Sequence, residues 1–314
     1  MKTIKIGLLG LGNIGTGTYK TLEMNRSEIE STLNAKVEIV KILERDTERD
    51  RGITVPKEKF TSDPDEIFQD PEIDIVIELL GGIEPATTFM LSALKNGKHV
   101  VTANKAALAA NYHELINTAK ENNVILRFEA SVGGGIPILG TLTGPLRANK
   151  FEEVMGILNG TTNYILTMMT KEGLDYETAL KDAQEQGFAE ADPTADVEGI
   201  DAANKLTILM ALMFDKYVAP KDIPTTGITE ITKEKIEEAR SNGCKIKLIA
   251  HAWRDENDEI KYEVRPMYIS ATHPLANINK EFNAVFVKGN AVDDVMFYGK
   301  GAGMQRVNRR VNMT

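Results

Sequence analysis

The 314-residue sequence predicts an α/β protein that has a doubly wound parallel sheet followed by a second domain of α+β structure. Three observations predict this class. Short apolar stretches alternate with helical stretches over residues 4–128, and a glycine-rich turn joins the first strand to the first helix. The alternation ends near Gly133, and the length suits two domains. We expect a first domain over residues 1–132, a second over 133–298 and a return segment over 299–314.

The first strand and the turn after it form a dinucleotide-binding pattern. The predicted strand, residues 4–9, runs directly into the glycine turn, and a helix is expected to continue to about Leu33. Gly10 would permit a tight turn, Gly12 would let backbone N–H groups approach a pyrophosphate, and Gly15 would allow close packing of helix on strand. The positive end of the helix would face the anion. The pattern predicts a Rossmann-type domain, whose candidate cofactor-binding residues here are Gly10, Gly12, Asn13, Ile14 and Gly15.

The alternation continues with four more strands. We expect strands at residues 37–43, 73–80, 99–102 and 124–128, and helices at residues 87–96 and 112–122. Ligands of such a sheet bind beyond the carboxyl ends of the strands. This rule places Gly81 and residues 103–105 at the predicted site.

The choice of cofactor depends on the residues after the second strand, Glu44-Arg45-Asp46. An acid there can accept hydrogen bonds from the ribose 2′-hydroxyl of NAD, whereas Arg45 can neutralise the 2′-phosphate of NADP. Arg49 or Arg51 can assist Arg45. The sequence supports both cofactors and favours NADP slightly.

Charge and cysteine content exclude several classes. The formal net charge is -9 and the 37 Lys and Arg residues form no long basic run, so a nucleic-acid partner is not expected. The single cysteine, Cys244, rules out an internal disulfide and fits a reducing compartment. No apolar run reaches the roughly 20 residues of a membrane helix. Lys5 and two glycines interrupt the apolar start, which therefore does not resemble a signal peptide. We expect a cytoplasmic protein.

The second half begins with a strand at residues 151–158 that ends in a polar turn, residues 159–163, before a helix at 164–169. Hydroxyl, amide and backbone N–H groups at a helix N-terminus can hold a carboxylate or simply cap the helix. Further strands are expected at residues 245–253 and 262–270, with Ile260 and residues 285–287 as additions.

Residues 183–205 contain six acids, five of them from Glu190 onward, before a single cation, Lys205. Because Pro193 and Gly199 would each damage a helix interior, this segment is not one long solvated helix. A helix starting near Gly199 would place Asp201 and Lys205 on the same side. The pair is either an ordinary ion pair of a core helix or part of a functional site. The acids Glu190, Asp192 and Asp196 can alternatively form a Mg²⁺ or Ca²⁺ site.

Four segments together resemble homoserine dehydrogenase: residues 10–15, 102–105, 159–163 and 187–205, with a match that extends to about Met304. The resemblance implies interconversion of aspartate 4-semialdehyde and L-homoserine with NAD(P)H, in threonine and methionine biosynthesis. It implies that Lys205 is the acid/base and that Lys105 stands between nicotinamide and substrate. Glu190 and Asp201 would hold the amino and hydroxyl groups of the substrate.

The resemblance also implies further ligands. The other candidate substrate-binding residues are Asn159, Gly160, Thr161 and Asp196, and the other candidate cofactor-binding residues are Arg45, Gly81, Thr102 and Gly303. A monovalent cation such as Na⁺ would bind Glu129 and the backbone carbonyls of Val132, Gly134 and Ile136. Family members are usually homodimers through the second domain, in which strands near residues 245–270 would form the interface.

The sequence departs from the family after Met304. A helix normally returns there to the nucleotide domain, whereas residues 305–314 are polar and basic, as if the chain were truncated or altered. The chain has no room for the regulatory domain of the ACT type. Two alternatives stay open: an inactive nucleotide-binding remnant, and another Rossmann dehydrogenase of a small carbonyl substrate. Aspartate-semialdehyde dehydrogenase is disfavoured because Cys244, its only possible nucleophile, has no histidine close in sequence.

Overall fold

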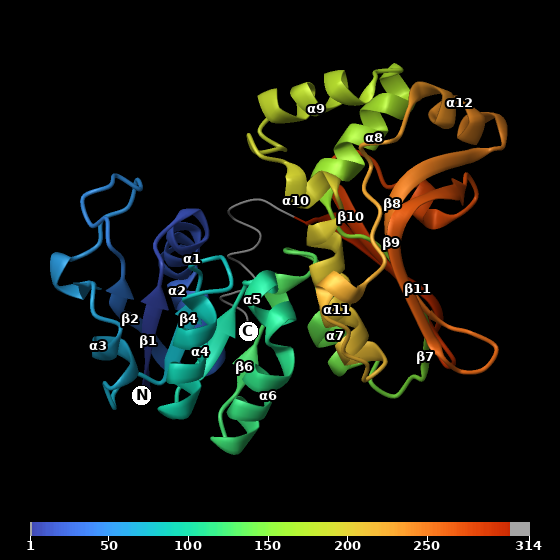
Figure 1. Cartoon of the computed structure of the whole chain (residues 1–314). Coiled ribbons are helices and arrows are strands. Elements are labelled where there is room, and N and C mark those ends of the chain that lie inside the picture. Colours follow the sequence, from blue (N-terminus) through green and yellow to red (C-terminus); the bar gives the residue numbers. More distant parts are fainter. Residues whose placement is uncertain (1, 302–314) are drawn as a thin grey trace. The chain divides into compact units, whose positions relative to one another are not determined.

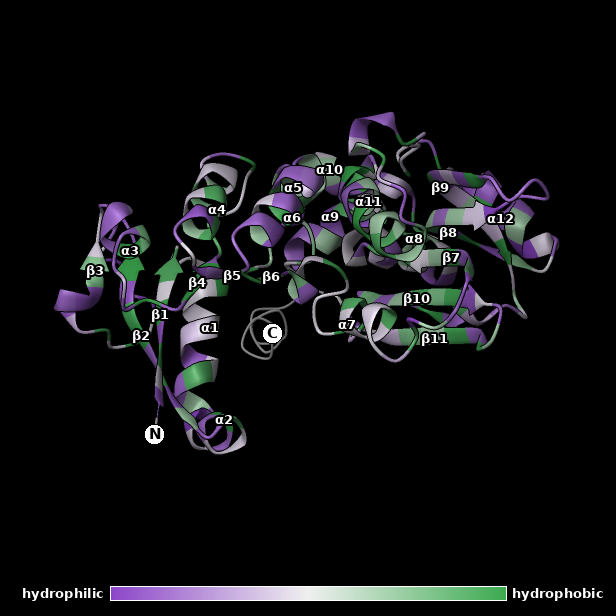
Figure 2. Ribbon diagram, turned by 90° about the horizontal axis from the view of Figure 1, so that it is seen from below, coloured by the Kyte–Doolittle hydropathy of each residue, from purple (hydrophilic) through white to green (hydrophobic). Residues whose placement is uncertain are grey.

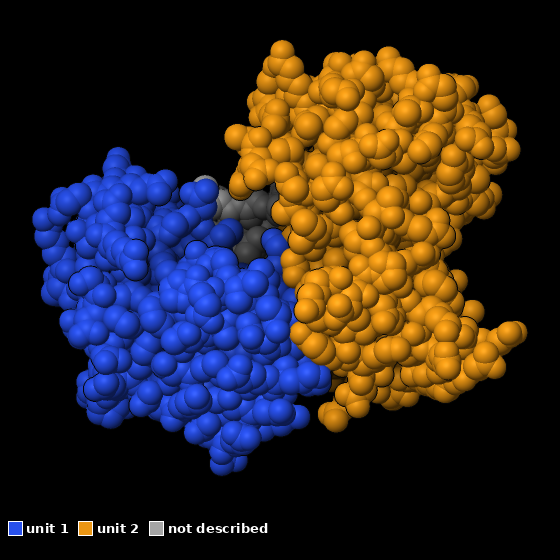
Figure 3. All heavy atoms as spheres, in the orientation of Figure 1, with its two compact units in different colours: residues 1–134, 303–314 blue, residues 135–302 orange. Residues whose placement is uncertain are grey.

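The computed structural model describes residues 2–301 of the chain. It divides the chain into two compact units: unit 1 comprises residues 1–134 and 303–314, and unit 2 comprises residues 135–302 (Figure 3). Within the described range, no helix is long and apolar enough to cross a membrane.

Unit 1 is built on six parallel strands in the order β3-β2-β1-β4-β5-β6 (Figure 1). The strands are β1 (Lys2–Leu9), β2 (Ala35–Leu43), β3 (Phe60–Thr61), β4 (Ile75–Glu78), β5 (His99–Thr102) and β6 (Leu126–Arg127). The chain builds outward from β1 in one direction and then returns to add β4 on its other side. This reversal confirms the predicted doubly wound sheet and creates a switch point at the carboxyl ends of β1 and β4.

Helices cover both faces of this sheet: α1 and α2 lie on one face, and α3, α4 and α6 on the other (Figure 2). The helices of unit 1 are α1 (Asn13–Met24), α2 (Arg26–Leu33), α3 (Asp65–Phe68), α4 (Ala86–Lys95), α5 (Lys105–Ala110) and α6 (Tyr112–Glu121), with short 3-10 turns η1 (Lys57–Lys59) and η2 (Glu129–Ser131). Because both faces are covered, the second half of β1, residues 6–9, is buried and apolar, and β4 has three apolar residues before Glu78.

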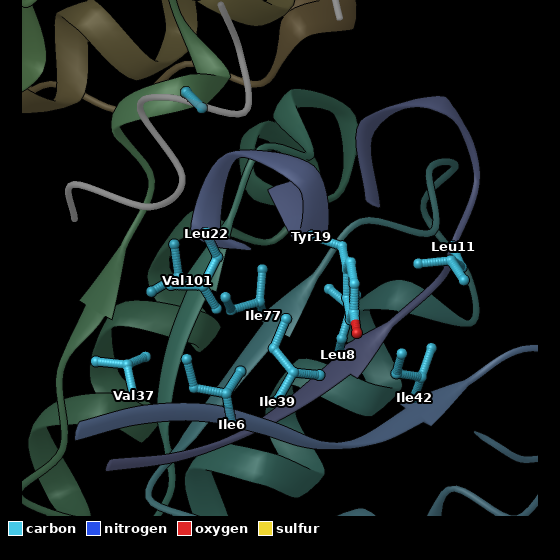
Figure 4. Packing of buried hydrophobic residues seen from close by; sticks show 11 residues of the cluster. Ile6, Leu8, Leu11, Tyr19, Leu22, Val37, Ile39, Ile42, Ile77 and Val101 are labelled. Atoms are coloured by element: carbon cyan, nitrogen blue, oxygen red, sulfur yellow. The ribbon is translucent and has the colours of Figure 1, made fainter. Parts of the chain in front are cut away.

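The core under α1 shows why these strands need apolar side chains on this face. Tyr19 and Leu22 of α1 pack over Ile6 and Leu8 of β1 and over Ile39 of β2 (Figure 4). Leu8 is completely buried. This packing holds the N-terminal end of α1 beside the end of β1.

Several elements of unit 1 differ from the prediction: β3, α3 and α5 were not predicted, and some of the predicted elements have other bounds. The single helix expected to about Leu33 is broken at Asn25, whose φ of -111° and ψ of 18° are not helical. Arg26 then anchors α2 beside β2 by donating to the carbonyl of Val37 and pairing with Glu30. The strand expected over residues 73–80 is shorter and comprises only Ile75–Glu78; just after it, the Glu78 carboxylate accepts a hydrogen bond from the backbone N–H of Leu80 at 2.8 Å.

Unit 2 contains a five-stranded sheet in the order β11-β10-β7-β8-β9, in which all neighbouring strands are antiparallel (Figure 1). The strands are β7 (Phe151–Ile157), β8 (Cys244–Arg254), β9 (Ile260–Ser270), β10 (Phe282–Gly289) and β11 (Asp293–Lys300). The predicted strands are confirmed as β7 to β10, whereas β11 was not predicted. The first strand of the unit in sequence, β7, occupies the centre of the sheet.

Helices α8 and α11 pack along one face of this sheet. The helices of unit 2 are α7 (Leu139–Thr143), α8 (Gly160–Glu172), α9 (Tyr176–Glu185), α10 (Thr194–Val197), α11 (Ile200–Met213) and α12 (Lys233–Ser241), with the 3-10 turns η3 (Pro220–Asp222) and η4 (Pro274–Asn277). The sequence predicted α8 and α11 but missed α7, α9, α10 and α12. The polar turn predicted before a helix at residue 164 is in fact the first turn of α8.

Candidate active site

Three backbone positions shape the glycine turn between β1 and α1. Gly10 has a φ of 91°, which glycine adopts without strain, and its N–H donates to the last carbonyl of β2 at 3.0 Å. A Cβ at Gly15 would lie 2.1 Å from the carbonyl oxygen of Gly10, so only glycine lets α1 approach β1 this closely. A Cβ at Gly12 would meet nothing within 4 Å among the described residues. Asn13 and Ile14 follow in the first turn of α1, and no side chain of the described residues caps the positive end of this helix.

A buried polar cluster lies at the carboxyl ends of β4 and β5. Glu78 is fully buried, and its carboxylate accepts a hydrogen bond from the Thr102 hydroxyl at 2.6 Å. The side chain of Asn104 lies 3.5 Å from the same carboxylate and caps α5 by accepting a backbone N–H bond at 3.1 Å. The cap fixes the start of α5 at Lys105. Gly81, with a φ of 83°, turns the chain away from the end of β4.

The loop after β2 is organised by hydrogen bonds and an ion pair to the carboxylate of Glu44. Glu44 accepts hydrogen bonds from the backbone N–H groups of Leu11 at 3.0 Å, Arg45 at 2.9 Å and Asp46 at 3.1 Å. The guanidinium of Arg51 lies 3.3 Å from the other side of this carboxylate. The side chain of Arg45 is exposed. Glu44 therefore fixes the loop beside the glycine turn, and Arg45 presents a cation at its surface.

In unit 2, Asn159 joins the start of α8 to two carboxylates. Its Oδ1 accepts the backbone N–H of Thr162 at 2.9 Å and caps the helix. Its Nδ2 donates to Asp196 Oδ1 at 2.7 Å and to Asp201 Oδ2 at 2.9 Å. The segments expected to contain the substrate site are thus brought together by one amide.

The lysine of the acidic segment faces this cluster from the second turn of α11. Lys205 Nζ donates to Asp201 Oδ2 at 2.6 Å and to the backbone carbonyl of Leu158 at 2.6 Å. The two charged side chains are 12% and 6% exposed, so water screens their charges poorly. Gly199, with a φ of 81°, starts the helix. The predicted pairing of Asp201 and Lys205 on one side of this helix is confirmed.

Other predicted substrate residues lie around the start of α8. The Thr161 hydroxyl donates to the backbone carbonyl of Phe188 at 2.7 Å. A Cβ at Gly160 would lie 2.9 Å from a backbone oxygen just before β10, so this position leaves no space for a side chain. Glu190 is exposed, and its backbone carbonyl accepts a hydrogen bond from Gln184 at 3.1 Å.

The candidate cation ligands are buried. Glu129 begins η2 and is 8% exposed, and Val132 and Ile136 are almost completely buried. Gly134 is also buried. Among residues 2–301, no group of three or more His, Cys, Asp or Glu side chains is arranged to hold a metal ion. This result disfavours the divalent-metal alternative, whereas a site made largely of backbone carbonyls is not tested by it.

The remaining calls and omissions concern three places in the chain. Gly303 and the departure from the family over residues 305–314 lie outside the described residues. Glu78 was not predicted, although an acid at the end of an apolar strand is a signal for a buried polar cluster. Asn283, which donates to the carbonyl of Leu158 at 2.9 Å, was not predicted either.

Two family models match the chain. The model for the NAD binding domain of homoserine dehydrogenase matches residues 10–129, and the model for homoserine dehydrogenase matches residues 137–311. The second match continues past Met304, where the resemblance noted from the sequence ended.

Curated relatives and solved structures carry the same name. The chain is 46% identical over 303 residues to homoserine dehydrogenase of Bacillus subtilis, and this alignment covers 96% of the chain and 70% of that protein. It is 43% identical over 304 residues to the Synechocystis homoserine dehydrogenase, again covering 96% and 70%. The crystal structure of a homoserine dehydrogenase from Thiobacillus denitrificans superposes with a TM-score of 0.95 at 42% identity, covering 100% of this chain and 72% of that one. A hyperthermophilic archaeal homoserine dehydrogenase in complex with NADPH gives a TM-score of 0.82 at 25% identity, covering 99% and 96%.

Proposed function

Because the chain belongs to the homoserine dehydrogenase family, we propose that Lys205 and the carboxylates beside it carry out its substrate chemistry. The activity of the chain is the NAD(P)-dependent interconversion of aspartate 4-semialdehyde and L-homoserine, a step of threonine and methionine biosynthesis. Family membership favours this function over another Rossmann dehydrogenase of a small carbonyl. The turnover assay described below separates it from an inactive nucleotide-binding protein.

One observation carries the proposed role of Lys205: its Nζ is held by Asp201 and by a backbone carbonyl, both at 2.6 Å, in a site with little solvent exposure. Reduction of an aldehyde develops negative charge on the oxygen, which must then be protonated. A fixed ammonium group can stabilise that charge and supply the proton. The nicotinamide cofactor, when bound, supplies the hydride.

The groups around Lys205 match the polar ends of the substrate. Asp201 and Asp196 offer carboxylate oxygens to an ammonium or hydroxyl group, and we assign the same role to Glu190. Gly160 and Thr161 lie in the first turn of α8, whose backbone N–H groups favour a carboxylate. An amino acid with a short oxygen-bearing side chain has each of these groups.

The proposed role is tested by Lys205→Ala, with loss of reduced-nicotinamide absorbance on adding aspartate 4-semialdehyde as the assay. Turnover should be lost while NADPH still binds, as measured by its fluorescence. Lys181→Ala is the matched control, because Lys181 is an exposed lysine of the same unit. Loss of NADPH binding together with turnover would instead indicate a structural lysine.

The cofactor site proposed for unit 1 uses the glycine turn and the ends of β4 and β5. The open space at Gly12, before an uncapped N-terminus of α1, fits a pyrophosphate. We assign Gly81 and Thr102 to the cofactor site because both lie at the carboxyl ends of parallel strands, where this fold binds ligands. Lys105 is proposed as the second lysine of the reaction, and Lys105→Ala should lower kcat.

NADP is the proposed preferred cofactor. The Glu44 carboxylate already accepts three backbone N–H bonds and faces Arg51, which leaves it poorly suited to a ribose hydroxyl. Arg45 places an exposed guanidinium next to it. Arg45→Ala should raise the KM for NADPH several-fold and leave the KM for NADH unchanged, with Lys2→Ala, an exposed cation at the opposite end of β1, as the control. Equal effects on both cofactors would contradict the proposal.

A monovalent cation is the proposed ligand of Glu129 and of the carbonyls of Val132, Gly134 and Ile136. Its support is that Glu129 and the three residues that would supply the carbonyls are all buried, which suits a dehydrated ion. Thermal unfolding in matched NaCl and tetramethylammonium chloride tests it. Na⁺ should raise the melting temperature of the wild type and should not affect Glu129→Gln.

A homodimer is proposed through the face of the unit 2 sheet opposite α8 and α11. By strand register this face carries Met155, Met296 and Tyr298, and Tyr298 stacks on Phe282 at 5.0 Å. Met296 and Tyr298 are 39% and 53% exposed, a large apolar surface for a sheet. Tyr298→Lys should dissociate the dimer in sedimentation velocity, whereas the exposed Met24→Lys in unit 1 should not. A monomeric wild type would refute the proposal.

A further inference from the structure

The backbone carbonyl of Leu158 is the point at which the unit 2 sheet meets the lysine of the proposed site. β7 ends at Ile157, which pairs with Ala284 at the last position of the ladder between β7 and β10. The next carbonyl, that of Leu158, accepts two side-chain donors instead of a strand partner. These are Lys205 Nζ at 2.6 Å and Asn283 Nδ2 at 2.9 Å.

The carboxamide of Asn283 has almost no freedom to move. Asn283 is 2% exposed. A Cβ at Gly160 would lie 3.5 Å from its Oδ1, and a Cβ at Gly301 would lie 2.1 Å from its Nδ2, so the amide fits between two positions without side chains. The adjacent backbone is fixed as well, because Asn163 of α8 donates to the carbonyl of Phe282 at 2.9 Å.

The other end of this amide is not satisfied. Asn283 Oδ1 is buried and has no hydrogen-bond partner among residues 2–301. A buried acceptor without a donor lowers the stability of the fold. A leucine of similar volume would avoid this cost, so fold stability alone does not account for an amide at this position. The Nδ2–H bond to Leu158 is the interaction that a leucine could not make.

From these contacts we infer that Asn283 is a positioning residue for Lys205, an inference that rests on the proposed role of that lysine. The Asn283 amide holds the peptide plane between Leu158 and Asn159. The orientation of that peptide affects Lys205 in two ways. Its carbonyl accepts a hydrogen bond from Lys205 Nζ, and the side chain of the next residue, Asn159, binds Asp201, the counter-ion of Lys205. Rotation of the peptide would move both contacts together.

The size of the effect follows from the sensitivity of catalysis to geometry. A misplacement of about 1 Å can reduce a rate by about 100-fold. When the Leu158 carbonyl loses one of its two donors, the shift of Lys205 should be smaller than this distance. We expect Asn283→Leu to lower kcat about tenfold at every pH, and to leave the KM for NADPH unchanged because the proposed cofactor residues belong to unit 1.

Asn283→Asp separates positioning from a general loss of structure. The introduced carboxylate has the shape of the amide but cannot donate to Leu158 while ionised. Burial raises the pKa of a carboxyl group, so the protonated form, which can donate, should be populated when the pH is lowered. The kcat ratio of Asn283→Asp to wild type should therefore be about 0.1 at pH 8 and should recover toward 1 near pH 6. Asn290→Asp is the matched control at the other end of β10, because its Oδ1 acceptor for Lys150 is retained.

A second measurement does not depend on turnover. Reductive methylation followed by mass spectrometry reports how firmly Lys205 is held, relative to the exposed Lys181. Asn283→Leu should speed methylation of Lys205 several-fold and leave that of Lys181 unchanged. If the wild type showed no turnover, the proposed function would be wrong. The methylation rates would still show whether Asn283 holds Lys205 in place. Three results would each overturn the inference. They are an unchanged methylation rate of Lys205 in Asn283→Leu, a kcat ratio of Asn283→Asp to wild type that does not vary with pH, and a loss of NADPH affinity in Asn283→Leu as large as its loss of kcat.

Discussion

Replacing Lys247 by methionine should remove a pH dependence that this lysine gives to the unfolding of unit 2. Lys247 lies on β8, is 2% exposed, and donates from Nζ to Asn163 Oδ1 at 2.9 Å and to the carbonyl of Ile278. Both acceptors are neutral. Burial lowers the pKa of Lys247 from 10.5 to about 7, with a smaller contribution from the positive charges of Lys245 and Lys171.

The sign of the effect follows from proton binding in the two states. Between pH 7 and 10.5 the unfolded chain binds a proton at this lysine that the folded chain does not, so the free energy of unfolding rises with pH. The two pKa values differ by about 3.5 pH units, and one unit corresponds to about 1.4 kcal/mol, so the full range amounts to about 5 kcal/mol. Above pH 10.5 both states are neutral, and below pH 7 the penalty is complete.

Urea unfolding at fixed protein concentration between pH 7.5 and 9.5 measures this dependence. Trp253, the only tryptophan of the chain, lies on the same strand and reports the unfolding of unit 2. Relative to Lys247→Met, the wild type should gain about 1.4 kcal/mol per pH unit. The methionine leaves the Asn163 oxygen without its donor. This loss shifts the unfolding free energy of the variant by the same amount at every pH. Parallel plots of unfolding free energy against pH for the two proteins would refute the reasoning.

Three further substitutions test the backbone and the buried polar cluster. Gly15→Ala should abolish NADPH binding, measured by fluorescence, because its Cβ would lie 2.1 Å from the Gly10 carbonyl; retained affinity would contradict the role of this contact. Thr102→Val should lower the free energy of unfolding of unit 1, measured in urea, by about 1–3 kcal/mol, because the buried Glu78 carboxylate loses its 2.6 Å donor. A loss below about 0.5 kcal/mol, which is typical of a surface substitution, would show that the carboxylate finds another donor. Gly199→Ala should cost about 1–2 kcal/mol because the φ of 81° is strained for alanine, and an unchanged melting temperature would show that the start of α11 relaxes.

The parts of the fold that the sequence predicted are those in which neighbouring residues carry the information. The apolar strands of unit 1 are buried on both faces, and the close packing predicted for Gly15 is confirmed by the 2.1 Å approach. The spacing of Asp201 and Lys205 predicted their pairing for the same reason, because four residues make about one helical turn. By contrast, β11 was not predicted, because it is a half-exposed edge strand whose apolar stretch has only four residues, 295–298.

The site itself depends on contacts between distant segments. Asn159 meets Asp196 and Asp201 across 37 and 42 residues, and Asn283 meets Leu158 across 125. No spacing rule connects these positions, since each contact follows from how α8, α10 and β10 pack. Resemblance to a family supplied the identities of several of these residues, but Asn283 lies outside the segments that carried the resemblance.

The central place of β7 has a consequence for how the protein is made. The ribosome releases β7 before either of its partners, β8 and β10, and the latter begins only at Phe282. At elongation rates of roughly 5–20 residues per second, about 6–25 s pass between the synthesis of β7 and that of β10, its second partner strand. The parallel sheet of unit 1 requires nothing beyond Arg127 and can form during that interval. Newly made chains therefore pass through a stage in which all strands of the unit 1 sheet are available and β7 still lacks a partner strand, and a chaperone would bind them at this stage.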